Sequence, residues 1–588
     1  MTLYKNQRFA NGETAFRGSY SPPVQCPSPW NKVVLDWWGL VDGLQTDRVG
    51  GLWMGSVEIF RTTTPLTQPS GAVWHVDKDV TEYSSILEAN QTVFIMVLNY
   101  IGQSTPAPIY VNATLTFYEA GIEYPPAQFP QQIIGLNSGS NVPWFVMSNG
   151  NVSLSTNVSL THETSRAYLE VFATPHSPCD EFWYALEVTS CNSGSPYREF
   201  RLFIDGRLSG IALPLPIMYS GAFNPEMWKP VPSILSMNVP AYNITLTPFI
   251  DVLADGKDHA LTLQIFNYHD RWRVDANLLL YLGTSQFGSL TAANVASEPA
   301  LNTNQMITGS IVTNSTSADD SIVVSRSVVN AQGETNTTTK EDIEFANTKT
   351  LDITLSQETI YQTQTFTTTT ITSGADGNFT ETLTDYFTLK TVFNVELPSL
   401  LAASADSTFS QTHSREVNGT LSLCTSTDMI QATTLGPTPI VEEETTGYTH
   451  SQSSDGGSLF CPTSTVEIST GRINVGVTGL EFVVVLALIV SFGTSDNRRR
   501  TLANILQLAG LLLLSAFLVL AYAKFALIAN YRIGAASATF ASSPELLMGS
   551  IGVLLLIGWA WFRRAEVAKV ADDKVIDGFP IRSGYSPQ

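Results

Sequence analysis

The sequence has few charged side chains. They make up 14% of its 588 residues, against about 25% in typical soluble domains. Acidic residues outnumber basic ones, 52 to 31, and the formal net charge is −21. A protein that neutralises phosphates needs a basic face, so this balance argues against a nucleic-acid partner. The seven histidines lack His-x-His and His-Glu-x-x-His spacing, so we expect neither a metal nor another cofactor.

Cysteine is scarce as well, with five residues in the chain. Cys179 and Cys191 could close a short disulfide loop, and Cys424 and Cys461 a longer one, which would leave Cys26 unpaired. The alternative is five reduced, buried thiols. We expect disulfides because the compartment indicated by the glycosylation motifs is oxidising.

Asn-x-Ser/Thr motifs are abundant, by contrast. Nine of them occur, all before residue 420. Their number, and their absence from the apolar C-terminal region, predict a glycosylated surface in a secretory compartment. The nine asparagines are Asn90, Asn112, Asn151, Asn157, Asn243, Asn314, Asn336, Asn378 and Asn418.

The N-terminal half has the texture of short β-strands. A chain of this length needs two or three cores. β-Branched and aromatic runs such as 32–38 and 92–98 alternate with clusters of Gly, Pro, Asn and Asp, without a sustained helical period. We therefore predict an all-β protein with two adjoining antiparallel sandwiches, residues 12–130 and 131–290, with a seam near the Pro-rich stretch 125–130.

Residues 291–470 are rich in Thr and Ser, with 365–372 as the extreme. Alternation of apolar and polar residues in this region favours a further β domain. The alternative is an O-glycosylated stalk, especially for residues 433–470.

Three apolar runs follow, at 475–492, 502–522 and 546–562. They approach the length needed to cross a bilayer, and basic clusters follow the first and the third. We expect three transmembrane helices, with two as the alternative, a cytoplasmic tail over 563–588 and an extracellular or lumenal N-terminal region.

The N-terminus has no apolar stretch of signal-peptide length. Either a start exon is absent, or the three C-terminal apolar runs direct targeting; we favour the first.

The most informative motifs lie in the first half of the chain. Residues 26–83 include Gln-Thr-Asp47-Arg48-Val-Gly-Gly-Leu-Trp, 196–206 read Pro-Tyr-Arg-Glu-Phe-Arg-Leu-Phe-Ile-Asp-Gly, and 272–277 read Trp-Arg-Val-Asp-Ala-Asn. In this order they strongly resemble the peptide-N-glycosidase A family of plant and fungal peptide-N4-(N-acetyl-β-glucosaminyl)asparagine amidases. The resemblance is strong over the first half and loose over the Thr-rich region.

The resemblance implies a hydrolase acting on N-glycosylated peptides or proteins, which releases the glycan and converts Asn to Asp. Hydrolysis of that amide needs a carboxylate to activate water or attack the carbonyl, an acid for the leaving glycosylamine and donors for the oxyanion. Similarity of the Asp-Arg motif to the bacterial peptide-N-glycosidase F implies two jelly rolls with the site in the cleft between them.

Two residues are the catalytic candidates: Asp47, implied as the key carboxylate, and Glu199, implied as the second. Arg48 is expected to orient a carboxylate or bind a substrate oxygen, and Asn99 stands near the place of a third acidic residue of the bacterial enzyme. Five further side chains complete the prediction: Glu181 as a cleft rim or only a turn residue, Trp53 and Trp183 as sugar-stacking or core residues, and Glu58 with Arg61 as a surface pair.

A second functional hypothesis stays open at this point. The same sandwiches on a membrane anchor could form a catalytically silent glycan-binding or adhesive surface protein. Asp47 favours the enzyme, while the missing third carboxylate and the unusual anchor keep the binding protein as the alternative. A transporter is disfavoured because the apolar runs carry almost no polar residues.

Overall fold

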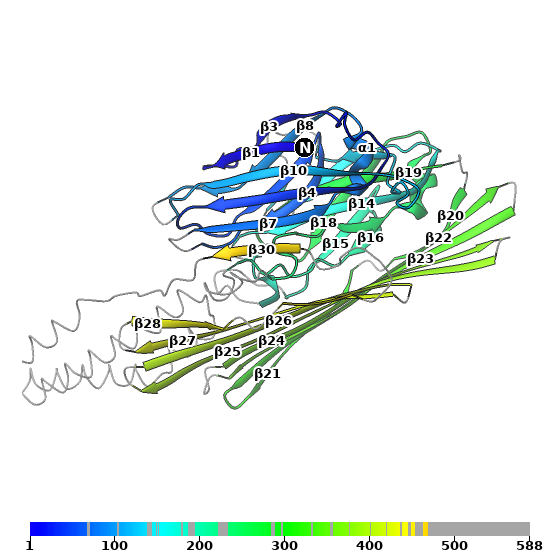
Figure 1. Cartoon of the computed structure of the whole chain (residues 1–588). Coiled ribbons are helices and arrows are strands. Elements are labelled where there is room, and N and C mark those ends of the chain that lie inside the picture. The colour runs from blue at the N-terminus through cyan, green and yellow to red at the C-terminus, as the bar shows by residue number, and fades with distance from the viewer. Residues whose placement is uncertain are drawn as a thin grey trace, which may run out of the picture. The chain divides into compact units, whose positions relative to one another are not determined.

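The computed structural model describes most of residues 1–468. The undescribed positions are 68–70, 103–104, 138–143, 149, 151, 178–179, 186–194, 221–232, 284–287, 296–297, 331–332, 353–356, 375–376, 400–401, 419, 436–437, 445–447, 453–462 and 469–588. The described chain is built from β-strands, with only the four-residue helices α1 (Ser84–Leu87) and α2 (Ile250–Leu253) and three single 3₁₀ turns. The prediction of an all-β protein is confirmed (Figure 1).

The chain divides into two compact units. The first comprises Met1–Asn394, Asp406–Gln431 and Glu443–Gly471, and the second comprises Val395–Ala405, Ala432–Glu442 and Arg472–Gln588. The contacts described below that concern the site all lie within the first unit.

The first sandwich consists of a five-stranded and a four-stranded sheet. The five-stranded sheet has the order β1 (Thr2–Phe9), β10 (Ile109–Glu119), β4 (Trp30–Val41), β7 (Ala72–Asp79) and β30 (Thr463–Ile468). The four-stranded sheet has the order β3 (Phe16–Tyr20), β8 (Gln91–Val97), β5 (Val49–Met54) and β6 (Val57–Thr63). The strands β2 (Asn11–Gly12) and β9 (Asn99–Tyr100) pair with each other and form a separate two-stranded sheet. The first sandwich therefore includes β1, which precedes residue 12, and β30, which follows the long Thr/Ser-rich region (Figure 1).

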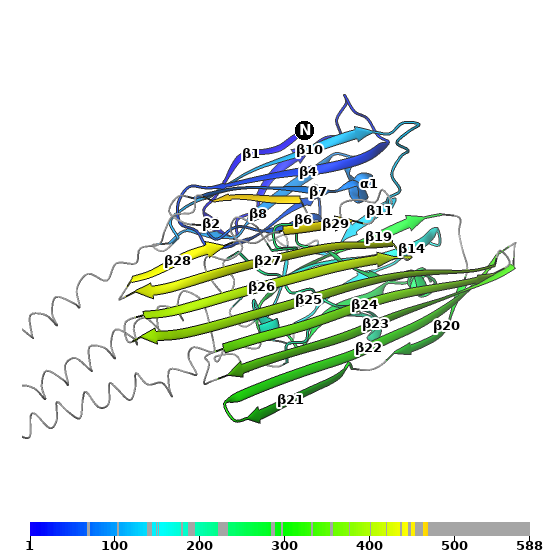
Figure 2. The ribbon, with the colours of Figure 1, turned by 60° about the horizontal axis from the view of Figure 1, so that its bottom comes forward.

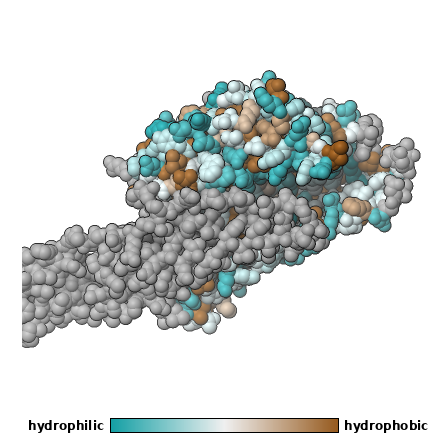
Figure 3. All heavy atoms as spheres, viewed as in Figure 1, coloured by the Kyte–Doolittle hydropathy of each residue, from teal (hydrophilic) through white to brown (hydrophobic). Residues whose placement is uncertain are grey.

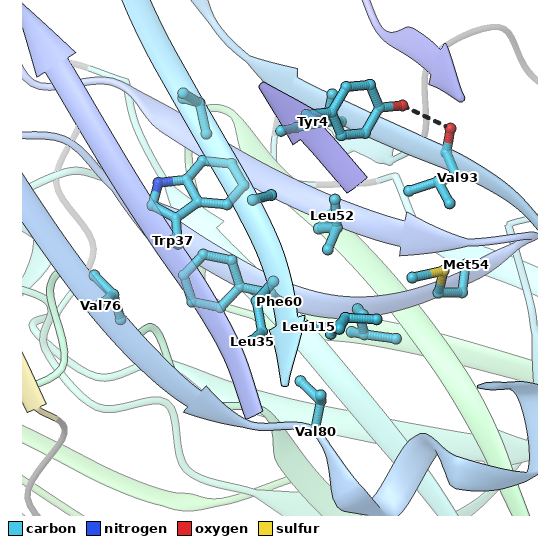
Figure 4. Packing of buried hydrophobic residues seen from close by; sticks show 14 of the residues in the cluster. Tyr4, Leu35, Trp37, Leu52, Met54, Phe60, Val76, Val80, Val93 and Leu115 are labelled. Carbon is cyan, nitrogen blue, oxygen red and sulfur yellow. Dashed lines mark hydrogen bonds between the residues drawn. The ribbon is translucent and has the colours of Figure 1, made fainter. Parts of the chain in front are cut away.

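The core of the first sandwich follows from strand alternation. In β4, Val33, Leu35 and Trp37 are buried while Trp38 and Leu40 are exposed, as expected when successive side chains point to opposite faces. Figure 4 shows Leu35 and Trp37 meeting residues of the facing sheet, which include Leu52 and Met54. At the side of the same core, the Tyr4 hydroxyl donates to the Val93 carbonyl at 2.9 Å (Figure 4).

The second sandwich also has a five-stranded and a four-stranded sheet. The larger sheet has the order β11 (Gln132–Gly135), β19 (Trp272–Leu282), β14 (Thr164–Pro175) and β17 (Tyr242–Thr245), with β12 (Phe145–Met147) also pairing with β19. The smaller sheet has the order β13 (Leu154–Val158), β18 (His259–Phe266), β15 (Glu199–Ile204) and β16 (Arg207–Ala212). Between the sheets, the ring of Phe200 packs on Tyr242 and Trp272.

The Thr/Ser-rich region forms a ten-stranded sheet, called the long sheet below. Its strands are β20 (Gly288–Val295), β21 (Ala300–Thr308), β22 (Ile311–Asn330), β23 (Gly333–Asp352), β24 (Gln357–Gly374), β25 (Gly377–Ser399), β26 (Ala402–Val417), β27 (Thr420–Leu435), β28 (Thr438–Glu444) and β29 (Tyr448–Gln452). Pairings from β20 to β25 are antiparallel, and Figure 2 shows β22 to β25 lying side by side. One face of β23 is buried in strict alternation, which places Ile343, Phe345, Asn347 and Lys349 on the same side.

The surface visible in Figure 3 mixes hydrophilic and hydrophobic residues over the first sandwich. Eight of the nine predicted glycosylation asparagines are described, since Asn151 is among the undescribed residues. Seven of the eight are exposed and Asn314 is half-buried. Their positions are compatible with the predicted modification.

Several predictions fall on residues that the structure does not describe. The apolar runs 475–492, 502–522 and 546–562 and the tail 563–588 lie there, and no helix in the described part of the chain is long and apolar enough to cross a membrane. The predicted disulfides also stay untested: Cys179, Cys191 and Cys461 are undescribed, as is the side chain of Cys424. Cys26 is a free thiol, directed at the Phe117 carbonyl at 3.7 Å.

Candidate active site

Asp47 lies in a hydrogen-bonded loop of the first sandwich, residues 42–48, between β4 and β5. The Gln45 backbone pairs with Thr67 in both directions: its N–H donates to the Thr67 hydroxyl at 2.8 Å and its carbonyl accepts from the Thr67 N–H at 2.8 Å. One residue after Asp47, the Arg48 backbone pairs with Thr64 in the same way, at 2.9 and 2.8 Å. The loop is thus anchored on both sides of Asp47, which fixes the direction of its carboxylate.

Arg48 and Asn99 support this loop from the inside. The Arg48 guanidinium donates to Gln45 Oε1 at 2.8 and 3.2 Å and to the Tyr100 carbonyl at 3.3 Å. Asn99 is fully buried, and its Oδ1 accepts from Gln45 Nε2 at 2.7 Å. The amide of Asn99 therefore provides a hydrogen-bond acceptor for the loop residue Gln45, and the side chain at this position is uncharged.

The Asp47 carboxylate meets two side chains of the second sandwich. Asp47 Oδ2 lies 3.7 Å from His176 Nδ1, which lies 3.7 Å from Glu181 Oε2. The three side chains, called the Asp47 group below, are mostly buried, with 5%, 18% and 12% exposed. Asp47 Oδ2 is buried and accepts no hydrogen bond from any described residue. Such an oxygen is costly unless a substrate or water group meets it.

His176 and Glu181 belong to one segment, which begins where β14 ends. The Glu181 N–H donates to the Ser177 carbonyl at 2.8 Å. Between them, the Asp180 carboxylate accepts from the Arg198 guanidinium at 2.7 and 3.0 Å and from the His269 N–H at 2.8 Å. This buried charge pair ties the segment to the second sandwich, so that Glu181 faces the first one.

Tyr219 and Arg273 stand beside the Asp47 group. The Tyr219 ring packs on His176 with centroids 5.0 Å apart, and its hydroxyl donates to the Pro175 carbonyl. Burial, followed by the nearby Glu181 and Asp47 carboxylates, raises the pKa of Tyr219 well above its ordinary value, so the phenol stays protonated.

Arg273 is paired with Thr174 across β14 and β19 and so points to the same face of the sheet as Thr174. Its Nη2 lies 3.3 Å from Glu13 Oε1. Its Nε and Nη1 are buried and donate to no described residue. These are two N–H groups in a fixed planar fork, the kind of donor that binds a carbonyl or carboxylate oxygen.

The predicted surface pair Glu58–Arg61 is wrong, because both side chains are fully buried between the sandwiches. The Arg61 guanidinium binds Glu58 through two contacts of 2.5 and 2.7 Å and donates to Thr174 Oγ1 at 2.8 Å. Burial raises the pKa of Glu58, and the Arg61 charge opposes that shift.

The backbone of β6 continues this contact. The Arg61 carbonyl accepts from the Val239 N–H at 3.1 Å, and the Thr63 N–H donates to the Ser236 carbonyl at 3.1 Å. The strand at the edge of one sandwich is thus covered by the other. This contact holds the two sandwiches together and with them the halves of the Asp47 group.

The two tryptophans of the sequence prediction are buried. Trp53 is 1% exposed, and its indole N–H donates to Asp275 Oδ2 at 2.7 Å across the sandwich contact. Trp183 is 3% exposed and packs against Tyr184 and Arg198. Neither ring offers a free face to a sugar in this structure.

Glu199 does not join the Asp47 group. It begins β15 on the face opposite Phe200, where its carboxylate accepts from the Tyr197 hydroxyl and lies 3.1 Å from Arg201 Nε. Burial, followed by the Asp320 carboxylate of β22, raises the pKa of Glu199 to about 8. The surroundings of Glu199 are the second sandwich and the long sheet.

Two groups among the described residues have the donor atoms and spacing to hold a metal ion: the Asp47 group and the group of Asp36, His75 and Asp77. In each, the three ligand atoms lie within 4.8 Å of one another. Geometry alone therefore does not separate a carboxylate–imidazole site from a metal site.

The comparisons with known proteins decide the family. Residues 2–298 match the family model of peptide N-acetyl-β-D-glucosaminyl asparaginase amidase A. The chain belongs to this family. The match confirms the family expected from the sequence motifs and covers both sandwiches except β30, with Asp47, His176 and Glu181 among the matched residues.

A curated member of the amidase A family is also similar to the chain. The peptide-N4-(N-acetyl-β-glucosaminyl)asparagine amidase A of Prunus dulcis is 32% identical over 309 residues, which are 48% of this chain and 54% of the relative. The match thus spans about half the length of that relative.

Two solved structures are similar to this chain, with lower sequence identity than the curated relative. A peptide-N(4)-(N-acetyl-β-D-glucosaminyl)asparagine amidase matches 48% of this chain and 96% of its own, with 14% identity and a TM-score of 0.33. A structure of PNGF-II matches 48% of this chain and 64% of its own, with 11% identity and a TM-score of 0.34.

His176 is a candidate site residue that was not predicted from the sequence. It stands outside the motifs quoted above, and a single histidine after a strand carries no spacing signal. The useful signal was its place between the end of the apolar run 167–173 and the acidic pair Asp180-Glu181. Polar residues at such a strand end often face a site, because loops carry the functional side chains of a rigid scaffold.

Proposed function

We propose that the protein is a glycoamidase that hydrolyses the amide bond between asparagine and the first sugar of an N-glycosylated peptide or protein. The observation that carries the proposal is the buried Asp47 Oδ2, which accepts no hydrogen bond from any described residue and faces His176 and Glu181 of the other sandwich. The family of the chain supports the class of reaction.

Asp47 acts in this proposal as the general base. Its carboxylate takes a proton from a water molecule as that water attacks the amide carbonyl carbon, which forms a tetrahedral oxyanion. The Nε and Nη1 groups of Arg273, which donate to no described residue, stabilise the negative oxygen. Donors fixed in a water-poor site lower the barrier more than they would in bulk water.

His176 and Glu181 complete the proton transfers. As the carbon–nitrogen bond breaks, the leaving nitrogen needs a proton, and the imidazole between two carboxylates is placed to deliver one. The products are an aspartate side chain and a glycosylamine, which loses ammonia in water. Arg48 and Asn99 hold the loop of Asp47 and take no part in the proton transfers.

Glu199, Trp53 and Trp183 have structural roles. Glu199 is a structural carboxylate between the second sandwich and the long sheet, and Trp53 and Trp183 are core residues. Sugar stacking by these two rings is therefore not part of the proposed mechanism.

Membrane anchoring through the apolar runs 475–492, 502–522 and 546–562 belongs to the proposal as well. Exposed sequons before residue 420 and basic clusters after the first and third runs support an extracellular or lumenal location of the catalytic region. Protease protection of the full chain in sealed vesicles tests this: the region before residue 470 should be protected and 563–588 cleaved.

The activity is tested with the full chain purified in detergent and a fluorescent glycopeptide, beside Asp47→Asn. The formerly glycosylated residue should gain about one mass unit, as expected for conversion of Asn to Asp, and this gain should be absent with the variant. An intact glycopeptide in the presence of folded protein would refute the glycoamidase. Retained binding of the glycan would then favour a glycan-binding protein.

A further inference from the structure

The long sheet touches the segment that carries Glu181. Glu181 is followed by the 3₁₀ turn η2 (Trp183–Ala185). The carbonyl of Tyr184 accepts from Asn347 Nδ2 at 2.9 Å, and the carbonyl of Ala185 accepts from Lys349 Nζ at 3.2 Å. Asn347 and Lys349 both belong to β23 of the long sheet.

These contacts are fully enclosed. Asn347 is 1% exposed and Lys349 is 2% exposed. Asn347 Nδ2 also donates to Gln362 Oε1 at 2.7 Å, and the Lys349 ammonium lies 3.3 Å from Glu358 Oε2, both on β24. A lysine is rarely buried unless it is paired, so the sequence keeps two polar donors here where an apolar side chain would ordinarily stand.

The donors serve backbone acceptors that have lost access to water. A buried carbonyl left without a partner is costly, and here the partners of two successive carbonyls come from one strand. Because residues two apart in β23 point to the same face, Asn347 and Lys349 reach adjacent points of the turn. The local sequence of β23 is thus matched to this turn.

Two anchors therefore enclose Glu181. On its N-terminal side, the neighbouring Asp180 is bound by Arg198. On its C-terminal side, Tyr184 and Ala185 are bound by β23. Residues 341–364 of the long sheet lie outside the family match, which ends at residue 298.

We propose that the long sheet is part of the catalytic unit, and that Asn347 and Lys349 are positioning residues which hold the Glu181 segment against Asp47. This inference rests on the proposed function. It assigns the Thr/Ser-rich region a role in aligning the acid side of the site with the base side.

The test compares Asn347→Leu and Lys349→Met with a control, all in the full chain. Arg326→Met is the matched control, because Arg326 also joins the long sheet to the second sandwich, through Asp251 at 2.5 and 2.9 Å, without touching the Glu181 segment. Lys349→Arg restores a donor of similar length and serves as the rescue variant.

The expected result is a fall in kcat of about 10- to 100-fold for both variants with KM changed by less than about 3-fold, because misplacement of a catalytic group acts on the chemical step. Arg326→Met should keep kcat, and Lys349→Arg should recover most of it. Hydrogen exchange in residues 180–185 should accelerate in the two variants and stay unchanged in the control.

Other outcomes overturn the inference. Unchanged kcat and unchanged exchange in both variants would show that β23 does not hold the segment. An equal loss of kcat in Arg326→Met would show that the loss comes from general destabilisation and not from displacement of the Glu181 segment. An inactive wild-type chain would refute the proposed function, whereas the exchange measurement would still decide whether β23 orders the Glu181 segment.

Discussion

Two groups of one histidine and two carboxylates among the described residues have the spacing to hold a metal ion, and they differ in how they are built. In the Asp47 group the three side chains come from a loop of the first sandwich and a segment of the second, and they are mostly buried. In the group of Asp36, His75 and Asp77, called the Asp77 group below, they come from two neighbouring strands of one sheet.

The Asp77 group follows from strand pairing alone. Asp36 lies opposite Asp77 and Trp38 opposite His75 in the pairing of β4 with β7. His75 Nε2 lies 3.0 Å from Asp77 Oδ1, and its ring stacks on Trp38. The Asp77 side chain is 38% exposed, so water screens its charge and satisfies its oxygens.

The difference teaches that composition does not identify a site. Residues facing each other on a solvated sheet reach short distances without any functional demand. Burying Asp47 Oδ2 at the meeting of two sandwiches, with no hydrogen-bond donor among the described residues, has a cost that the fold must offset elsewhere. That cost is the reason for assigning catalysis to the Asp47 group.

The largest effect separating the two groups is expected from Asp47→Asn. The amide cannot take a proton from water, so kcat/KM for a glycopeptide should fall about 1,000-fold or more. Asp77→Asn is the matched change in the half-buried Asp77 group and should alter kcat/KM less than about 2-fold. Equal losses in both variants would remove the distinction.

A smaller loss is expected from His176→Gln. Glutamine keeps a polar side chain but cannot carry a proton between Asp47 and Glu181, so kcat should fall about 100-fold. The limb of the pH–rate profile that belongs to the histidine should disappear, a change that mere loosening of the segment would not produce. His75→Gln should leave both kcat and the profile as they are.

Buried and exposed carboxyls should also differ in how stability depends on pH. Burial raises the pKa of Glu341 from 4.5 to about 8, and no cationic side chain of the described residues opposes the shift. The folded state therefore binds a proton that the unfolded state releases, so this contribution is fully present below about pH 4.5 and is lost as pH rises through about 8.

Glu341→Gln should therefore increase the free energy of unfolding at pH 9 by on the order of 1 to 4 kcal/mol relative to the wild type. Tm should rise at pH 9 and stay nearly unchanged at pH 4.5. The glutamine oxygen can still accept from the Ile211 N–H, as Glu341 does at 3.1 Å. Asp77→Asn should flatten the same Tm profile much less. An unchanged slope in Glu341→Gln would contradict this account of the buried carboxyl.

The smallest effect is expected from removing divalent metals. Because the proposed mechanism transfers protons through Asp47 and His176, incubation with EDTA should change kcat less than about 2-fold. Loss of activity that is restored by added Zn²⁺ would instead assign the Asp47 group to metal-bound hydrolysis. Parallel metal-binding measurements on His75→Ala and His176→Ala would show which group holds the ion.

The sequence predicted the all-β class and pointed to Asp47, because alternation and an ordered motif are local signals. It did not identify His176, whose partner Asp47 stands on another sandwich. It also misread Glu58 and Arg61. In β6 every residue is buried, because the strand is covered on both faces. Alternation then disappears, and a charged residue in such a strand looks like a surface residue.

Glu199 shows the same difficulty in the second sandwich. Five of the six residues of β15 are buried, since the facing sheet covers one side and the long sheet the other. A glutamate in such a strand is recognised as structural only once the second covering layer is known. That layer is formed by strands far along the chain, which a local pattern does not reveal.

The position of β30 has a consequence for biosynthesis. β30 pairs with β7 at the edge of the five-stranded sheet (Figure 1). β7 ends at Asp79, yet its partner begins at Thr463. During translation this edge stays open until the whole long sheet has left the ribosome, and an open edge is a template for pairing with another chain.

A polypeptide ending at residue 298, the limit of the family match, would keep that edge uncovered permanently. It would also lack the strand that satisfies the carbonyls of Tyr184 and Ala185. Closure of this sheet edge and the proposed alignment of the Glu181 segment therefore depend on the same late-synthesised part of the chain. Until that part is synthesised, β7 stays an open edge that only another chain or a chaperone can cover.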